Sequence, residues 1–326
     1  MKTLGIGDLT AEAGTKTQGS LHVIPLAGNW DARIPTILIN GRKDGPIVNL
    51  HAGIHGDEFE GIRAIWQIAE QLRPDDLSGA IIATPIVNSA AYAAGMRESA
   101  IDGKNLARVF PGDPKGTSSD KLAHFFFQEV ILKSDYTLGL HSGGLRYRFH
   151  PLVEYYHGVK KDVEERAKAA AEAFAVGPFT VIQRISIPPA DVTCTYEASR
   201  NGVAAIEPEM WGEGRCLEEH VEQYVSSVMN VLSHLKMIRA QERITPSKVD
   251  LAEGRWVLAN SGGLFVPSVK IRDNVTEGQK VGAIKDDLGA VIEEVNAPAT
   301  GFIGALRTFP MIQPGDRAVM VEKKLS

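Results

Sequence analysis

Apolar and polar positions follow two different periods from the beginning of the chain to about residue 240. Short apolar runs bounded by Gly or Pro predict strands, and apolar residues spaced three or four apart predict helices. Strands are expected at 20–40 (edge strands), 48–51, 80–88, 136–141, 179–182 and 202–206. Helices are expected at 62–72, 119–131, 161–174 and 217–240. Strands that alternate with helices predict an α/β domain with a central sheet.

The pattern changes near residue 245. Thr245-Pro246 begins a linker, and short apolar runs separated by Gly, Pro and Asp follow it. These runs lie at 257–260, 263–267, 280–284 and 318–321. Short strands with turn residues between them predict an all-β module. We therefore expect two domains, residues 1–245 and residues 246–326.

Two histidines lie at the ends of predicted strands. His55 and Glu58 follow the strand at 48–51, in a Gly-flanked turn that opens onto a helix. Their i, i+3 spacing lets both side chains converge on one point. His141 ends the strand at 136–141, beside a Gly-Gly turn. Imidazole and carboxylate are ligands of catalytic zinc, so the sequence predicts a zinc site made by His55, Glu58 and His141 at the ends of a sheet.

A long polar loop at 97–113 contains Arg97 and Arg108. Long irregular loops inside compact domains are usually functional. Guanidinium groups match carboxylates in a bidentate manner, so this loop predicts a site for an anionic substrate. A solvated loop with surface ion pairs is the alternative.

Three carboxylates follow the predicted strand at 202–206: Glu207, Glu209 and Glu213. A carboxylate just past a strand end, before a Gly-rich turn and a helix, is where a general base could face a metal. The residue pattern alone leaves all three as candidates for that role.

Composition narrows the class of protein and its partners. The chain has 326 residues, of which 44% are hydrophobic and 23% charged, as in ordinary globular proteins. A net charge of −5 predicts neither nucleic acid nor an anionic membrane as partner. Two cysteines are too few for a disulfide framework. The N-terminus lacks the apolar core of a signal peptide, so a cytoplasmic location is expected, and the chain could form a homo-oligomer.

Three motifs, read in order, resemble those of the succinylglutamate desuccinylase/aspartoacylase family, which is related to the zinc carboxypeptidases. They are Gly-x-His-Gly-Asp-Glu at 53–58, Asn-Leu-x-Arg-x-Phe-Pro-Gly-Asp at 105–113, and Leu-His at 140–141. The resemblance extends from about Gly14 to Asp316. It implies a zinc carboxypeptidase-like mixed central sheet flanked by helices, and one Zn²⁺ per chain.

The resemblance also implies roles for individual residues. Arg108 matches a residue that binds a substrate carboxylate, with Asn105 nearby, and Arg97 matches one that polarises the scissile carbonyl. Ala107 stands where the family usually has Asn, which removes one hydrogen-bond donor. Alignment on Gly202 and Arg215 favours Glu209 as the general base, with Glu207 as the alternative.

The C-terminal module resembles a biotinyl/lipoyl-type barrel-sandwich domain. The resemblance rests on the stretch 273–282 and on the later 297–301. Carrier domains of that type display a modifiable Lys on a hairpin, but Gly289 and Ala290 occupy the matching position here. We therefore expect a structural or pocket-capping role for this module.

The combined interpretation is a zinc-dependent amidohydrolase that removes the acyl group from a small N-acyl amino acid or related acylated amine. Metal-activated water attacks, Glu209 moves the proton, and zinc with Arg97 stabilises the oxyanion. Two alternatives remain at this point. One is a zinc carboxypeptidase that acts on short peptides, and the other is a non-enzymatic binding protein on the same fold.

Overall fold

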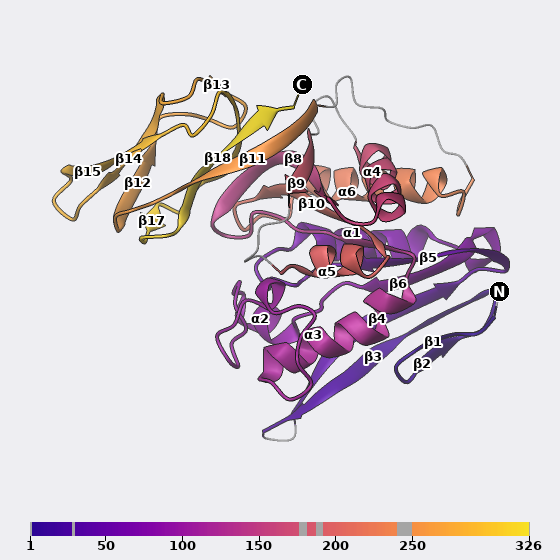
Figure 1. Cartoon of the computed structure of the whole chain (residues 1–326). Helices are drawn as coiled ribbons and strands as arrows, with labels where there is room; N and C mark the ends of the chain where they lie inside the picture. Colours follow the sequence, from indigo (N-terminus) through magenta and orange to yellow (C-terminus); the bar gives the residue numbers. More distant parts are fainter. Residues whose placement is uncertain (1, 28–29, 176–180, 187–191, 240–249, 326) are drawn as a thin grey trace.

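The computed structural model describes residues 2–27, 30–175, 181–186, 192–239 and 250–325 (Figure 1). Six α-helices occur in these residues: α1 (Glu60–Gln71), α2 (Ser89–Ala94), α3 (Ser118–Glu129), α4 (Lys161–Phe174), α5 (Cys194–Arg200) and α6 (Glu218–His234). The strands before residue 240 are β1 (Leu4–Ile6), β2 (Leu9–Ala11), β3 (Thr15–Leu26), β4 (Trp30–Asn40), β5 (Lys43–His51), β6 (Ser78–Thr84), β7 (Tyr136–Gly139), β8 (Tyr147–His157), β9 (Val181–Ser186) and β10 (Ala204–Gly212). The strands after it are β11 (Asp250–Leu258), β12 (Gly263–Pro267), β13 (Asn274–Val275), β14 (Lys280–Lys285), β15 (Val291–Asn296), β16 (Gly301–Arg307), β17 (Met311–Ile312) and β18 (Arg317–Lys324).

A twelve-stranded sheet runs through the molecule in the order β13-β16-β18-β11-β9-β8-β10-β7-β5-β6-β4-β3. Its middle, from β10 through β7 and β5 to β6, is parallel, and β8 joins β10 in the antiparallel direction. This mixed sheet with helices on its faces confirms the predicted fold class. β5 ends in four consecutive buried residues, because a parallel strand in the middle of a sheet is covered on both faces.

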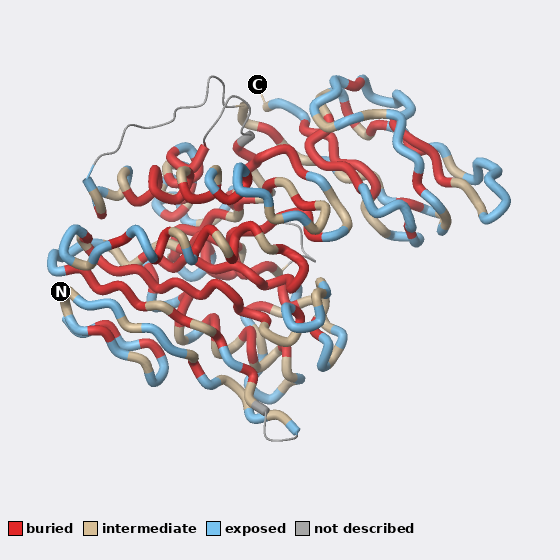
Figure 2. Tube along the Cα trace, turned by 180° about the vertical axis from the view of Figure 1, so that it is seen from behind, coloured by how far each residue is buried: buried red, intermediate tan, exposed pale blue. Residues whose placement is uncertain are grey.

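Helices cover both faces of this sheet and form two cores (Figures 1 and 2). On one face α1, α4 and α6 pack through residues such as Ile65, Phe174 and Tyr224. On the other face α3 and α5 pack through residues such as Phe126 and Ala198. The buried trace in Figure 2 follows the sheet between these two layers.

β10 is longer than the sequence pattern predicted. The expected strand at 202–206 was followed by carboxylates beyond its end, but β10 continues through Pro208 to Gly212. Pro lacks a backbone N–H, yet its carbonyl still accepts the His141 N–H at 3.0 Å. The prediction that Glu207 and Glu209 lie past the strand end is therefore wrong, and both lie within the strand.

The C-terminal strands extend the central sheet. β11 pairs in parallel with β9 and antiparallel with β18, and β16 pairs with β8. A second sheet, in the order β15-β14-β12-β17, completes the C-terminal all-β region. The predicted boundary at 245/246 and the predicted end of the helix at 240 lie outside the described residues, as do 179 and 180 of one predicted strand. In the described part of the chain, no helix is long and apolar enough to cross a membrane.

A buried carboxylate in β18 generates a stability prediction. Glu322 is 0% exposed, and neither carboxylate oxygen has a hydrogen-bond partner among the described residues. Burial raises the pKa of Glu322 from 4.5 to about 8. Between these values the unfolded chain loses the proton and the folded chain keeps it. Folding stability therefore falls as pH rises, by at most about 1.4 kcal/mol per pH unit through this group.

We expect Glu322→Gln to remove this pH dependence, so that the variant gains melting temperature over the natural chain at pH 8 more than at pH 5. Thermal melts at both pH values measure the difference. Glu277→Gln, a change at an exposed turn of the same region, serves as the control. An equal difference in melting temperature at pH 5 and pH 8 would contradict the prediction.

Candidate functional site

The turn after β5 positions two of the predicted ligands. His55 and Glu58 lie between the end of β5 at His51 and the start of α1 at Glu60. A Cβ atom at Gly56 would lie 2.0 Å from the backbone carbon of Ala91, so only glycine allows this close approach. The turn therefore presses against the start of α2 and holds both side chains at the end of the sheet.

His55, Glu58 and His141 come together as the sequence predicted. His55 Nδ1 lies 2.7 Å from Glu58 Oε1, and His141 Nδ1 lies 2.8 Å from Glu58 Oε2. One ligand atom of each residue lies within 4.8 Å of the others, and all three residues are buried. β5 and β7 are neighbouring parallel strands, which is why the segments that follow them meet.

The hydrogen bonds around the cluster show that its donor set fits a metal ion. Asn105 Oδ1 accepts the Ala107 N–H at 2.9 Å and lies 3.1 Å from His55 Nε2. His55 Nε2 therefore carries its proton, which leaves the Nδ1 lone pair facing the Glu58 carboxylate. A lone pair and an anion are held together by a cation between them, and the outer hydrogen bond of a ligating His is typical of metal sites.

Electrostatics at the cluster agree with this fit. Burial, with the nearby charge of Arg97, lowers the pKa of His55 to about 4, so its imidazole is neutral. Burial would lower the pKa of His141, but the facing Glu58 raises it to about 9. Burial would raise the pKa of Glu58, but the two imidazoles hold it well below its ordinary value. A bound cation would take the place of the proton on His141.

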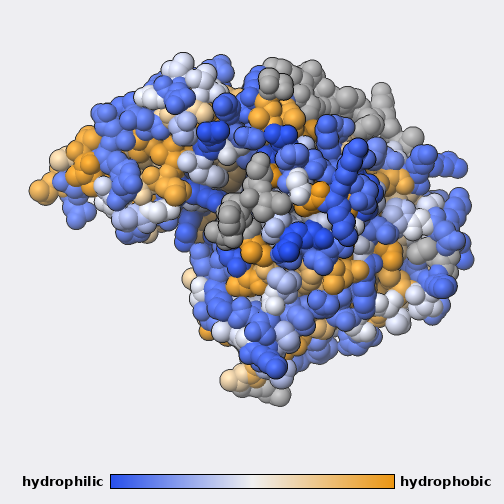
Figure 3. Space-filling model, viewed as in Figure 1, coloured by the Kyte–Doolittle hydropathy of each residue, from blue (hydrophilic) through white to orange (hydrophobic). Residues whose placement is uncertain are grey.

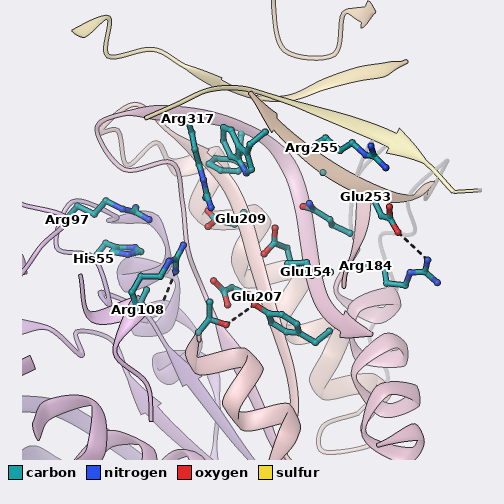
Figure 4. Close-up of a pocket in the computed structure, with 18 residues that line it drawn as sticks. His55, Arg97, Arg108, Glu154, Arg184, Glu207, Glu209, Glu253, Arg255 and Arg317 are labelled. Atoms are coloured by element: carbon teal, nitrogen blue, oxygen red, sulfur yellow. Dashed lines mark hydrogen bonds and ion pairs between the residues drawn. The ribbon is translucent and has the colours of Figure 1, made fainter. Parts of the chain in front are cut away.

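A cavity of about 340 Å³ opens from His55 (Figure 4). In the space-filling view a hollow with a largely hydrophilic rim lies between the C-terminal strands and the rest of the chain (Figure 3). Arg97 and Arg108, from the loop that the sequence singled out, line the cavity. Arg97 Nη1 also donates to Glu58 Oε1 at 3.0 Å.

The C-terminal strands β11 and β18 contribute five cavity residues that the sequence reasoning missed: Glu253, Gly254, Arg255, Trp256 and Arg317. Arg317 begins β18, and Trp256 lies in β11. The Arg317 guanidinium lies 5.0 Å from the centre of the Trp256 ring. Nothing in the local sequence marks them, because their place at the cavity depends on how β11 pairs with β9.

Glu207 and Glu209 both line the cavity, because residues two apart in β10 lie on one face. Glu207 Oε2 accepts the Thr195 hydroxyl at 2.5 Å, and Oε1 lies 3.8 Å from His141 Nε2. Glu209 Oε2 is buried and has no hydrogen-bond partner in the described part of the chain. Burial, with the charge of Glu58, raises the pKa of Glu209 to about 8. Glu213, the third candidate, pairs with Arg148 at 3.3 Å.

The position of Asn105 differs from that of the two arginines. Its side-chain oxygen caps the short turn Leu106–Arg108 and faces His55. Ala107, where the family usually has Asn, lines the cavity wall. The structure thus places Asn105 behind a metal-ligand candidate, and Arg97 and Arg108 at the cavity surface.

Comparison with known proteins identifies relatives over nearly the whole chain. Residues 44–235, more than half of the sequence, match the succinylglutamate desuccinylase/aspartoacylase catalytic domain family. The N-alpha-acetyl-L-2,4-diaminobutyric acid deacetylase of Halomonas elongata is 29% identical over 298 residues, which cover 90% of this chain and 86% of that protein.

Solved structures share the fold. The crystal structure of a succinylglutamate desuccinylase/aspartoacylase from Rhodobacter sphaeroides has 28% identity and a TM-score of 0.83, and the match covers 95% of this chain and 96% of that one. The product-bound ectoine utilization protein EutE (DoeB) of Ruegeria pomeroyi has 24% identity and a TM-score of 0.85, with 94% and 95% covered. At that identity the second match establishes the fold alone.

We expect the purified chain to bind about one divalent metal ion, because its buried donor set matches that of a catalytic site. His55→Ala removes one ligand and should abolish stoichiometric binding, as measured by elemental analysis after dialysis. His124→Ala, a change in α3 away from the cluster, is the matched control. Equal metal content in the natural chain and His55→Ala would contradict the assignment.

Asn105→Ala should keep the ligands but lose the hydrogen bond that orients His55. Loss of such an outer partner typically weakens metal affinity about 10–100-fold. Competition with a chromophoric chelator measures the dissociation constant. Unchanged affinity would show that the Asn105 contact does not support the metal site.

Proposed function

This chain belongs to the succinylglutamate desuccinylase/aspartoacylase family and is a hydrolase of amide bonds, and we propose that it is a zinc-dependent deacylase of a small N-acyl amino acid or related acylated amine. The observation that carries the proposal is the buried cluster of His55, Glu58 and His141 at the end of a charged cavity. Two His and one carboxylate are a recurrent ligand set of catalytic zinc, which keeps a further position open.

The cavity supports a small substrate. Its volume of about 340 Å³ is near the lower end of small-molecule sites. Trp256 and Arg317 cover it from the C-terminal strands, which disfavours a long peptide. Ala107 in place of the usual Asn also weakens recognition of a terminal carboxylate, the feature that a carboxypeptidase needs. The relative from Halomonas elongata, by its name, removes an acetyl group from the α-nitrogen of a diamino acid.

The residues of the cavity fit the steps of amide hydrolysis. Zinc, when bound, supplies Lewis acidity that polarises a carbonyl and lowers the pKa of water towards about 7. Glu209 accepts the proton of the attacking water and passes it to the leaving amine, while the acyl group leaves as a carboxylic acid. A carboxyl with a pKa of about 8 is suited to hold that proton near neutral pH. Arg97 lies beside Glu58 and can face the carbonyl oxygen, and Arg108 can pair with a substrate carboxylate.

The binding-protein alternative lacks support, because the three candidate metal ligands and the carboxylates Glu207 and Glu209 are all present at the cavity. A protein that only bound a ligand would not need a buried Glu209 whose Oε2 lacks a hydrogen-bond partner among the described residues. Glu207 is the second choice for the base, because its Oε2 already accepts the Thr195 hydroxyl at 2.5 Å. Glu209 is therefore the better candidate for proton transfer.

We expect Glu209→Gln to lower kcat about 10²–10⁴-fold on N-α-acetyl-L-2,4-diaminobutyrate, because the variant cannot accept a proton. Metal content should remain unchanged, which separates lost chemistry from a lost site. Glu213→Gln, in the same segment but paired with Arg148, is the control. A Glu209→Gln variant with the kcat of the natural chain would exclude Glu209 as the base.

A further inference from the structure

Glu154 and Glu207 form an acidic wall of the cavity. In Figure 4 they lie between Arg97, Arg108 and Arg317 on the His55 side and Arg184 and Arg255 on the far side. The arginines on the His55 side suit the carboxylate of an N-acyl amino acid, and Arg184 is paired with Glu253 at 3.3 Å. The acidic wall is not needed for that carboxylate or for an uncharged acyl group.

Strand register explains why the acidic wall forms. Glu207 of β10 is directly opposite Glu154 of β8, and Glu154 is paired in turn with Gln183 of β9. Residues directly opposite each other on neighbouring strands project from the same face of the sheet. Two carboxylates at such positions repel each other unless a cation lies between them or one is protonated.

Glu154 is held in place by a buried amide. In the orientation that satisfies both of its partners, Gln183 Nε2 donates to Glu154 Oε1 at 2.8 Å, and Gln183 Oε1 accepts the Gly254 N–H at 2.9 Å. Gln183 is 5% exposed, so this support for Glu154 is buried. Tyr156, two residues further along β8, also lines the cavity, and its hydroxyl is 2.9 Å from Thr193 Oγ1.

The charge of Glu154 is not balanced by the described residues around it. Burial and the charges of Glu207 and Glu209 raise the pKa of Glu154 well above its ordinary value, and the opposing charge of Arg317 does not outweigh them. Glu322, buried in β18, acts in the same direction. A cationic group inside the cavity would supply the missing charge.

We propose that Glu154, with Glu207 beside it, binds a free ammonium group of the substrate, and that the chain deacylates N-acyl derivatives of a diamino acid. This inference rests on the proposed deacylase function and names its substrate class. An ammonium group donates three hydrogen bonds and fits between two carboxylates. The same wall repels a second carboxylate, and so discriminates against acylated acidic amino acids.

The test uses the metal-loaded full chain and a pair of substrates of nearly equal shape. N-α-acetyl-L-2,4-diaminobutyrate carries an ammonium group where N-α-acetyl-L-norvaline carries a methyl group. We expect kcat/KM to be at least about tenfold higher for the diamino compound, because a buried charge pair supports recognition of that group. Glu154→Gln should lower its kcat/KM by about tenfold or more and leave that of the norvaline compound within about twofold.

Glu253→Gln is the matched control, since Glu253 lies at the same cavity but pairs with Arg184 at 3.3 Å. It should keep the ratio of kcat/KM between the two substrates. A Glu154→Gln variant that lowers kcat/KM equally for both substrates, or leaves both unchanged, would overturn the ammonium site while the deacylase function stands. If a variant melts below the assay temperature, Glu154→Asp, which keeps the charge, replaces it and should retain preference for the diamino compound.

If the chain hydrolyses neither substrate, that result counts against the deacylase function. Binding measurements then test the ammonium site separately. Calorimetry compares free L-2,4-diaminobutyrate with L-norvaline on the natural chain and Glu154→Gln. Tighter binding of the diamino acid that Glu154→Gln abolishes supports the ammonium site. Equal binding of both amino acids overturns it.

Discussion

One buried carboxylate, that of Glu58, organises the functional half of the molecule. It is 2% exposed, and a buried carboxylate is costly unless its oxygens are compensated. His141, Arg97 and the Ser142 N–H supply that compensation, and a cation shared with His55 Nδ1, 2.7 Å from Oε1, would complete it. These partners come from the turn after β5, the loop after α2 and the end of β7, so the need to satisfy Glu58 links three distant segments.

Sheet order places the chemistry around this carboxylate. β7 lies between β5 and β10, and these three strands run parallel. The segments after β5 and β7 therefore carry metal-ligand candidates, and β10 continues past them with Glu207 and Glu209. The metal-ligand candidates and the proposed general base thus share one edge of the sheet, as is usual for functional sites in α/β folds.

The sequence predicted those features that depend on local pattern. The His55–Glu58 spacing, the strand before His141 and the arginine loop are all readable within a few residues, and the helix at 161–174 agrees with α4. What it did not show depends on pairing between distant strands. Glu154 faces Glu207 only through the β8–β10 register, and Arg317 reaches the cavity only because β11 joins β9. The predicted strand at 202–206 stops before Pro208, whereas the pairing of β10 with β8 carries the strand through it.

The pairing of β11 with β9, and of β16 with β8, joins the C-terminal region to the catalytic sheet by backbone hydrogen bonds. A region attached in this way is a fixed wall of the cavity, because moving it away would break the β11–β9 and β16–β8 backbone hydrogen bonds together. Because the metal-ligand candidates lie in one part of the chain and this wall in another, we expect mutations in the wall to change which compound fits without altering the reaction. The fold thus assigns substrate fit and chemistry to different parts of the chain.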